Sequence, residues 1–460
     1  MKKFLNQIMA GNFHPVLTKG TWYCIQAGLS PKLAVQFELD AKQRKHNSVL
    51  KIIHTSDWHL GHQLHGFDRI HEHQAFLNWL KDLLITEQAD ALIVAGDIFD
   101  TANPPASAWQ MLYRFLAEVY RSIPDFNLVF TGGNHDSPSK LDAPHELLKA
   151  FDLHMIGGVS RDADGKLDTE RLLVPLTDKR GNTAAWVMAV PFLRSADLRT
   201  QHLDEVEDRL IAGVETLYQE VYAVATERRE PQQALIATGH VYMASGQLSE
   251  MSERRVLGGN QHALPASIFA EDIDYVALGH LHLAQKVAGQ ARIRYCGSPI
   301  PLSLSERNYQ HQVLSVEFED GKQQKITSHI VPRSVDLLRV PEKALPLDSV
   351  IKELEQWCPE TLPIEQQPLL EVPVLMDAPQ PLLREKIRAA LEGKSVRLAK
   401  ITPTYSQQAS QSPLDHKRLD EVTPEQVFDF GWQQKFEGEP SSAIKSAFTQ
   451  LLDQRDNEEC

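Results

Sequence analysis

Between about residues 49 and 310, apolar residues gather in short continuous runs, and each run is followed within three residues by glycine, histidine, aspartate or asparagine. The runs are 49–54, 91–95, 126–130, 234–238 and 275–278. Residues 70–84 and 109–120 instead carry apolar residues at three- and four-residue spacing, which predicts amphipathic helices. Continuous apolar strands that alternate with helices are typical of a layered α/β fold whose sheets are buried on both faces.

The first 48 residues depart from this pattern, because they have neither helical periodicity nor strand alternation. We expect residues 1–48 to be a linker or an upstream extension that the working protein does not contain. A basic arm or a targeting segment is the alternative. A sharper hypothesis places the start of translation at Leu50. We expect the first domain to cover residues 49–330.

The last third of the chain has a different style. Helical patterns at 349–357 and 381–391 and strand patterns at 369–376 and 396–401 predict a small α+β domain over residues 335–405. Residues 406–460 contain a polar linker and two amphipathic segments, 424–435 and 441–453. Helices of this length are marginal alone, so these segments need a partner surface.

The composition is that of an ordinary globular protein, with 42% hydrophobic and 23% charged residues. Lys and Arg number 47 against 61 Asp and Glu, and the net charge of −14 argues against a protein that coats nucleic acid electrostatically. It does not exclude an enzyme whose site holds its own cations. Four widely spaced cysteines, no apolar run near the roughly 20 residues of a membrane helix and no signal peptide predict a cytoplasmic protein without a membrane partner.

Candidate metal ligands follow all five apolar runs. They are Asp57, His59, Asp97, Asn134, His240, His280 and His282. Oxygen and imidazole donors without a thiolate suit Mn²⁺, Fe or Zn²⁺. Because seven ligands exceed the four of one closed site, we expect two ions that share a bridging carboxylate. Ions about 3.5–4 Å apart can hold the attacking and leaving oxygens of a displacement at phosphorus.

Isolated histidines carry less weight, since a lone histidine near a strand end is more often a buried polar residue than a ligand. We apply that interpretation to seven of the histidines outside the set, which are His54, His62, His65, His71, His73, His145 and His262. Glycine precedes a ligand segment four times, at Gly96, Gly133, Gly239 and Gly279. A glycine there permits a sharp turn or a close approach without a Cβ clash.

The five segments, in this order, resemble the calcineurin-like metallophosphoesterase superfamily. Within it, residues 54–61, 96–100 and 295–299 are similar to the bacterial SbcD-type nuclease subunits. The resemblance covers about residues 50–320 and continues weakly toward the C-terminus. It implies a layered β-sandwich flanked by helices, with a capping domain at 335–405 and partner-binding helices after it.

The resemblance also implies roles for the site residues. Asp57, His59 and His282 hold the first ion, Asn134, His240 and His280 hold the second, and Asp97 bridges them. His135 is the catalytic histidine that stabilises or protonates the leaving 3′ oxygen, and Asp136 orients its imidazole. The two ions are expected to be Mn²⁺.

Two further residues keep alternative interpretations. Asp100 is either close to the ligands or in contact with DNA, or else it caps the helix that begins near Pro104 and Pro105. Arg194 reaches either a substrate phosphate or a surface carboxylate.

The expected function is a metal-dependent DNA nuclease, a 3′–5′ double-strand exonuclease and single-strand or hairpin endonuclease of repair and recombination. The resemblance implies an SbcC-like coiled-coil ATPase as partner, with two nuclease subunits in a heterotetramer at the nucleoid. The sequence has no GxxxxGK[ST] motif, so ATP dependence must come from that partner. The alternatives are a small-molecule or phosphoprotein phosphoesterase with the same site, and a scaffold that mainly holds DNA ends.

Overall fold

The computed structural model describes residues 49–144, 147–148, 153–198, 206–244 and 263–405, together with positions 428, 432, 440, 444 and 448. The predictions for residues 1–48 and for the segments 424–435 and 441–453 lie outside these ranges, apart from the single positions. The chain divides into two compact units. The first contains residues up to 338 with 360–370 and 395–399, and the second contains 339–359, 371–394 and the chain from 400 onward.

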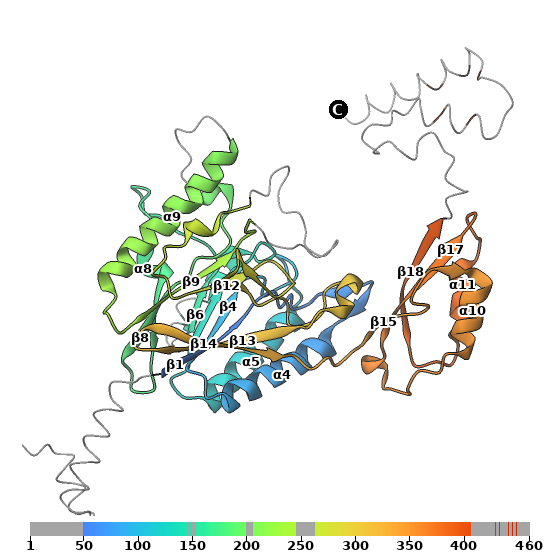
Figure 1. The fold of residues 1–460 in the computed structure, drawn as a ribbon, viewed down its shortest axis with the longest axis horizontal. Coiled ribbons are helices and arrows are strands. Elements are labelled where there is room, and N and C mark those ends of the chain that lie inside the picture. Colours follow the sequence, from blue (N-terminus) through green and yellow to red (C-terminus); the bar gives the residue numbers. More distant parts are fainter. Residues whose placement is uncertain are drawn as a thin grey trace, which may run out of the picture. The chain divides into compact units, whose positions relative to one another are not determined.

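Two six-stranded sheets form the first unit (Figure 1). The first sheet has the order β14 (Lys322–Ile330), β13 (Gln312–Glu319), β1 (Val49–Thr55), β4 (Ala91–Ala95), β5 (Asn127–Thr131) and β6 (Leu153–Ile156). The second has the order β11 (Gln285–Val287), β12 (Gln290–Tyr295), β10 (Tyr275–Gly279), β9 (Ala234–His240), β8 (Thr183–Met188) and β7 (Leu173–Thr177). Strands β1, β4, β5 and β6 run parallel, as do β8, β9, β10 and β12. Their carboxyl ends therefore meet at one edge of each sheet, where α/β proteins place their sites.

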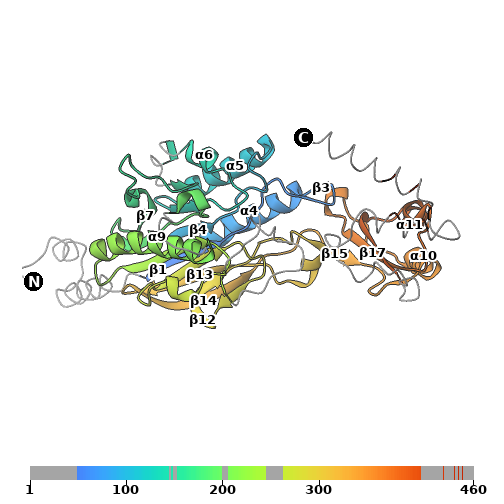
Figure 2. The same cartoon turned by 90° about the horizontal axis from the view of Figure 1, so that it is seen from above.

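Helices cover the two outer faces of this sandwich (Figures 1 and 2). The helices α4 (Ile70–Thr86) and α5 (Ala106–Ser122) pack on the first sheet, and α9 (Val206–Arg228) packs on the second. The helices predicted at 70–84 and 109–120 are thus confirmed. Shorter elements are β2 (Gln63–Leu64), β3 (Phe67–Asp68), α6 (Pro138–Asp142), α8 (Thr169–Leu172), η1 (Ser195–Asp197), η2 (Ala266–Ile268) and η3 (Leu304–Asn308).

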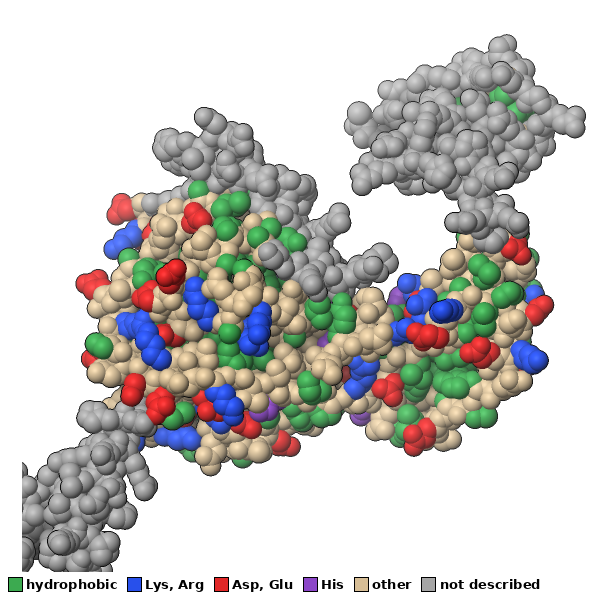
Figure 3. Space-filling view, in the orientation of Figure 1, with side chains coloured by type: hydrophobic (Ala, Val, Ile, Leu, Met, Phe, Trp, Pro, Cys, Tyr) green, Lys and Arg blue, Asp and Glu red, His purple; other side chains and the backbone are tan. Residues whose placement is uncertain are grey.

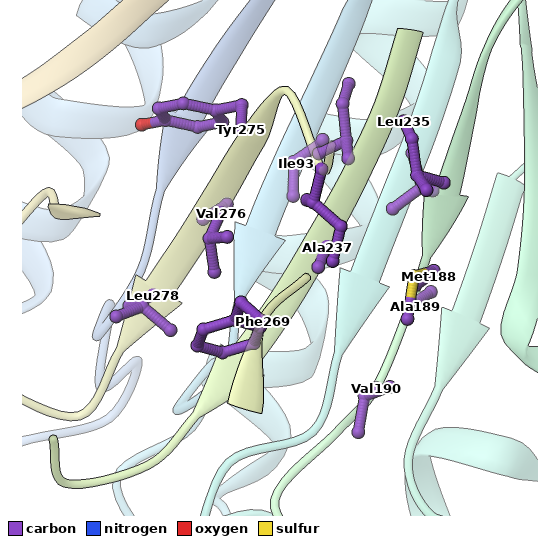
Figure 4. Packing of buried hydrophobic residues seen from close by; sticks show 14 of the residues in the cluster. Ile93, Met188, Ala189, Val190, Leu235, Ala237, Phe269, Tyr275, Val276 and Leu278 are labelled. Atoms are coloured by element: carbon purple, nitrogen blue, oxygen red, sulfur yellow. The ribbon is translucent and has the colours of Figure 1, made fainter. Parts of the chain in front are cut away.

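Strands β4 and β5 of the first sheet are buried at every position, as predicted for a sheet covered on both faces. In β4, Ile93 packs with the second sheet, whereas its neighbours Leu92 and Val94 pack with α4 and α5. This alternation follows from the two-residue period of a strand. In Figure 4, Ile93 lies beside Ala237 of β9 between the two sheets. The predicted layered fold is confirmed.

The later elements follow the predicted order of helices and strands. They are β15 (Leu337–Arg339), β16 (Leu345–Pro346), α10 (Leu347–Gln356), η4 (Ile364–Gln366), β17 (Leu369–Met376), α11 (Leu383–Ala390) and β18 (Arg397–Tyr405). Strand β17 pairs with β15, β16 and β18 in a four-stranded sheet. Helix α10 buries Val350 and Leu354, and α11 buries Ile387 and Ala390.

Charges of both signs are interspersed on the face drawn in Figure 3. Such mixing gives no extended field of one sign on that face. Among the helices that the structure describes, none is both long and apolar enough to cross a membrane.

Candidate metal centre

The loops that follow the parallel strands lie side by side. The backbone N–H of Asp57 donates to the carbonyl of Gly96 (3.0 Å), and that of His59 donates to the carbonyl of Asp97 (3.0 Å). The backbone N–H of His280, after β10, donates to the carboxylate of Asp57 (3.0 Å to Oδ1). These bonds bring the ends of β1, β4 and β10 together, so both sheets contribute to one site.

Four of the predicted ligands have a left-handed backbone. The φ angles are 54° at Asp57, 47° at His59, 49° at Asp97 and 102° at His280. Residues with a side chain rarely adopt such angles, which cost of order 1–3 kcal/mol each and cluster at functional sites. The surrounding hydrogen bonds hold the backbone in this strained conformation. The conformation directs the four side chains to a common point.

Two glycines allow the segments to come this close. Gly96 has φ of 88°, and a Cβ on it would lie 2.1 Å from Nδ1 of His240. A Cβ on Gly279 would lie 1.9 Å from the carbonyl oxygen of Ala95. The glycines expected to relieve a turn or a close approach therefore serve mainly the approach of one strand end to another.

Asp97 lies between two groups of donors. Its Oδ2 is 3.4 Å from Nε2 of His59 and 3.3 Å from Nε2 of His240. Asn134 Oδ1 is 2.9 Å from Nε2 of His240 and 3.1 Å from Nδ1 of His280. Three sets of donor atoms lie within 4.8 Å of one another, and they are Asp57–His59–His282, His59–Asp97–His135 and Asp57–Asp97–His240. The structure thus brings all seven predicted ligands together.

Three of the imidazoles are fixed through their second nitrogen. Nδ1 of His59 donates to Asp100 Oδ1 (3.2 Å), and Nδ1 of His240 donates to the carbonyl of Ala95 (3.0 Å). Nδ1 of His282 donates to Glu306 Oε1 (3.0 Å). Donation from Nδ1 leaves Nε2 as the ligand nitrogen, the arrangement usual around metal-binding histidines.

These residues fit a pair of divalent ions. The Nε2 atom of His59 is buried without a hydrogen-bond partner among the described residues, as expected of a nitrogen placed for a metal. The oxygen and nitrogen donors match hard or intermediate cations.

The buried charged groups of the site strongly perturb one another's pKa values. Burial disfavours the charged form of Asp97, yet the neighbouring His240 holds the pKa of this carboxylate well below its usual range. Burial also opposes protonation of His240, but Asp97 outweighs it and raises the pKa of His240 to about 9. Burial, with His240 nearby, lowers the pKa of His280 to about 3.

His135 lies beside this cluster. Its backbone N–H donates to Asp97 Oδ1 (2.8 Å), and its ring centroid is 4.7 Å from that of His59. Nδ1 donates to the carbonyl of Asp100 (2.6 Å), and burial lowers the pKa of the imidazole. Nε2 is therefore the nitrogen that can exchange a proton with a substrate.

Comparison with known proteins agrees with this geometry. The family model described as calcineurin-like phosphoesterase matches residues 50–284, and the model described as Type 5 capsule protein repressor C-terminal domain matches residues 333–436. The SbcD subunit of the SbcCD nuclease from Rhodobacter capsulatus is 38% identical over 384 residues, covering 82% of this chain and 93% of that protein. Its counterpart from Escherichia coli K12 is 33% identical over 391 residues, covering 83% and 92%. This chain belongs to the SbcD family. The resemblance stated from the sequence motifs is thereby confirmed, and the family is one of phosphodiester-cleaving hydrolases with a two-metal site.

One predicted role in this SbcD chain needs correction. The carboxylate of Asp136 accepts hydrogen bonds from the backbone N–H groups of Ile98 (3.0 Å), Phe99 (3.0 Å) and Gly133 (2.8 Å). It ties the loop after β4 to the loop after β5, and burial raises its pKa to about 6. The prediction that Asp136 orients the imidazole of His135 is wrong, because a backbone carbonyl makes that contact.

Asp100 has two contacts in the site, through its side chain to His59 and through its carbonyl to His135. The interpretation as a helix cap is wrong, because Pro105 occupies the N-cap position of α5. The guanidinium of Arg194 donates to the backbone carbonyl of Asp136 (3.0 Å), so it supports the loop that carries His135.

Sequence reasoning missed Glu306 and the carbonyl of Ala95. Glu306 follows the last ligand by 24 residues and sits in a segment without any repeated pattern, so no sequence signal marks it. A backbone carbonyl carries no side-chain signal at all.

Two histidines outside the ligand set, His54 and His73, make buried polar contacts. The hydroxyl of Tyr275 lies 2.9 Å from Nδ1 of His54, and Nε2 of His73 donates to the carbonyl of Trp58 (2.9 Å). Burial lowers the pKa of both imidazoles to about 3. His145 and His262 lie outside the described residues.

Proposed function

We propose that this chain is the metal-dependent DNA nuclease subunit of an SbcCD-type complex, acting as a 3′–5′ double-strand exonuclease and a single-strand or hairpin endonuclease. The observation that carries the proposal is the position of Asp97 between two groups of donors contributed by both sheets. Membership of the SbcD family supports DNA as the substrate.

The proposed ligand assignment is the one that the family resemblance implies, and the closeness of the donor atoms supports it. Asp57, His59 and His282 take one ion, Asn134, His240 and His280 take the other, and Asp97 bridges the two. Mn²⁺ is the proposed ion, because mixed carboxylate, amide and imidazole donors suit it. When bound, the pair of ions supplies an activated water and neutralises charge on the scissile phosphate.

The protein groups around the ions have separate tasks. The left-handed backbone at Asp57, His59 and Asp97 orients the donors before substrate arrives. His135, fixed by the carbonyl of Asp100, presents Nε2 to the leaving 3′ oxygen, and in its protonated, cationic form it stabilises or protonates that oxygen. Arg194 and the carboxylate of Asp136 hold the loop that carries His135, so their effect on catalysis is indirect.

The C-terminal segment is acidic, so affinity for DNA must come from other parts of the complex. Residues 401–460 carry five Lys and Arg against eleven Asp and Glu, so we do not expect this segment to bind DNA. We propose instead that it docks to an SbcC-like coiled-coil ATPase, with two nuclease subunits in a heterotetramer and residues 335–405 acting as a capping domain. A DNA substrate would place the complex in the cytoplasm at the nucleoid.

Substitution of His135 by Leu tests the proposal. We expect metal-dependent release of mononucleotides from linear double-stranded DNA to be abolished, with EDTA giving the same loss in the unmodified protein. The assay uses Mn²⁺ or Mg²⁺, with and without the ATPase partner.

The competing functions predict other outcomes. Cleavage of bis(p-nitrophenyl) phosphate without cleavage of DNA, even with the partner present, would indicate a small-molecule or phosphoprotein phosphoesterase. If H135L abolishes cleavage in vitro but repair in cells is unaffected, the chain is mainly a scaffold that holds DNA ends.

A further inference from the structure

Glu306, an acidic residue outside the seven proposed ligands, lies fully buried next to the site. The side chain of Glu306 has 0% of its surface exposed. Its Oε1 accepts from Nδ1 of His282 (3.0 Å), and its Oε2 accepts from the backbone N–H of Leu302 (2.8 Å). Buried carboxylates are rare unless they are paired, so the enclosure of Glu306 calls for a specific role.

The segment that carries Glu306 is firmly held. Glu306 lies in η3, where the Ser303 side chain accepts from the backbone N–H of Ser305 (3.3 Å) and the Tyr309 N–H donates to the Glu306 carbonyl (2.9 Å). The preceding Leu304 is buried in an apolar cluster with Leu64, Val335, Leu337, Leu369 and Ala399. The carboxylate is therefore placed by the fold before any ion binds.

The two hydrogen bonds of Glu306 select one tautomer of His282. Because an ionised carboxylate only accepts hydrogen bonds, Nδ1 of His282 must carry the proton, and the lone pair lies on Nε2. A neutral imidazole can ligate a metal only through the nitrogen that lacks a proton.

We propose that Glu306 is a positioning residue that holds His282 in the Nδ1–H tautomer and thereby sets the affinity of the first metal position. The proposal rests on the ligand assignment given above. Glu306 does not itself contact the ions; it acts through the imidazole.

Substitution of Glu306 by Gln changes this tautomer without changing the size of the side chain. The amide has one acceptor oxygen, and the N–H of Leu302 needs an acceptor. If the oxygen faces Leu302, the NH₂ group faces Nδ1 of His282 and favours the tautomer whose proton is on Nε2. The conflict weakens metal binding, and loss of such a partner typically costs about 10–100-fold in affinity.

The experiment measures Mn²⁺ binding to the full chain, without DNA, by the electron paramagnetic resonance signal of free Mn²⁺. We expect two sites in the unmodified protein, and in E306Q one site weakened about 10–100-fold while the other stays unchanged. Hydrolysis of bis(p-nitrophenyl) phosphate by E306Q should recover at higher Mn²⁺ concentration. The control E353Q makes the same chemical change on the exposed face of α10 and should leave both sites unchanged.

Other results overturn the proposal. Two sites of unmodified affinity in E306Q would show that the tautomer is set elsewhere. Loss of both sites, with a lower melting temperature of the metal-free variant and no recovery at high Mn²⁺, would show a purely structural role. If the unmodified protein itself fails to bind two ions, the ligand assignment fails first, and that result is visible before any variant is made.

Discussion

The contact between the ends of β4 and β10 leads to a quantitative prediction. A Cβ on Gly279 would lie 1.9 Å from the carbonyl oxygen of Ala95 and 2.9 Å from Nδ1 of His240. Real Cβ atoms essentially never come within 3.0 Å of a heavy atom outside their own residue and its two chain neighbours. Replacement of Gly279 by Ala must therefore separate the two strand ends by about 1.1 Å, the difference between 3.0 Å and 1.9 Å.

This displacement acts directly on the site. Gly279 precedes His280, one of the proposed ligands, and the Ala95 carbonyl that its Cβ would push away is the acceptor for His240. An error of about 1 Å in such a constellation can reduce the rate about 100-fold. Overpacking of a buried contact also destabilises the fold by about 1–3 kcal/mol. We therefore expect G279A to cleave about 100-fold more slowly and to melt at a lower temperature.

The assay is Mn²⁺-dependent hydrolysis of bis(p-nitrophenyl) phosphate, followed alongside thermal unfolding. Gly66→Ala is the matched control, because a Cβ there meets nothing within 4 Å although φ is 85°. G66A should lose about 1 kcal/mol of stability from its backbone conformation and retain its cleavage rate. A G279A protein with the unmodified rate and melting temperature would refute the reasoning about strand-end contact.

Three further predictions concern stability. The buried Asn127 side chain donates to the carbonyls of Asp90 and Thr177 and accepts from the N–H and hydroxyl of Thr177. N127A should therefore lower the free energy of unfolding in urea by about 2–4 kcal/mol, and a loss under about 1 kcal/mol would contradict this. Mn²⁺ at about 100 times its Kd should stabilise the folded chain by about 2.7 kcal/mol per ion. Removal of Mn²⁺ with EDTA should therefore lower the melting temperature. Equal melting temperatures with and without EDTA would argue against a metal site. Burial lowers the pKa of His73 from 6.5 to about 3, so below pH 6.5 the unfolded chain binds a proton at this residue that the folded chain does not bind. The free energy of unfolding should therefore fall toward pH 3 by up to about 1.4 kcal/mol per pH unit, and less steeply in H73Q. Identical slopes in urea titrations of the two proteins would contradict this prediction.

The clustering of the seven candidate ligands could be predicted from the sequence because its signal is local and repeated. Each ligand follows a continuous apolar strand, and parallel strands must end at a common edge. Helices α4 and α5 were predictable for a similar reason, since their apolar spacing is periodic. The structure adds that both sheets contribute, which the order of strands along the chain does not reveal.

The hydrogen-bond partners of the ligands could not be predicted in this way. Asp136 is the sequence neighbour of His135, yet its carboxylate is taken by three backbone amides, and the carbonyl of Asp100 holds the imidazole instead. Glu306 reaches His282 only because η3 folds back toward the site. Such contacts depend on the path of the chain in space, so they follow from tertiary structure and not from spacing.

Donors on two different sheets can meet only when most of the domain has been synthesised and folded. The N–H of His280 bonds to the carboxylate of Asp57, 223 residues earlier in the chain, and His240 reaches the carbonyl of Ala95 across 145 residues. Contacts over such separations form late, because the entropy of loop closure must be overcome before the contact compensates it. A growing chain that ends after β6 lacks His240, His280 and His282, which follow strands of the second sheet. A fragment that ends before the second sheet therefore cannot assemble the complete set of donors.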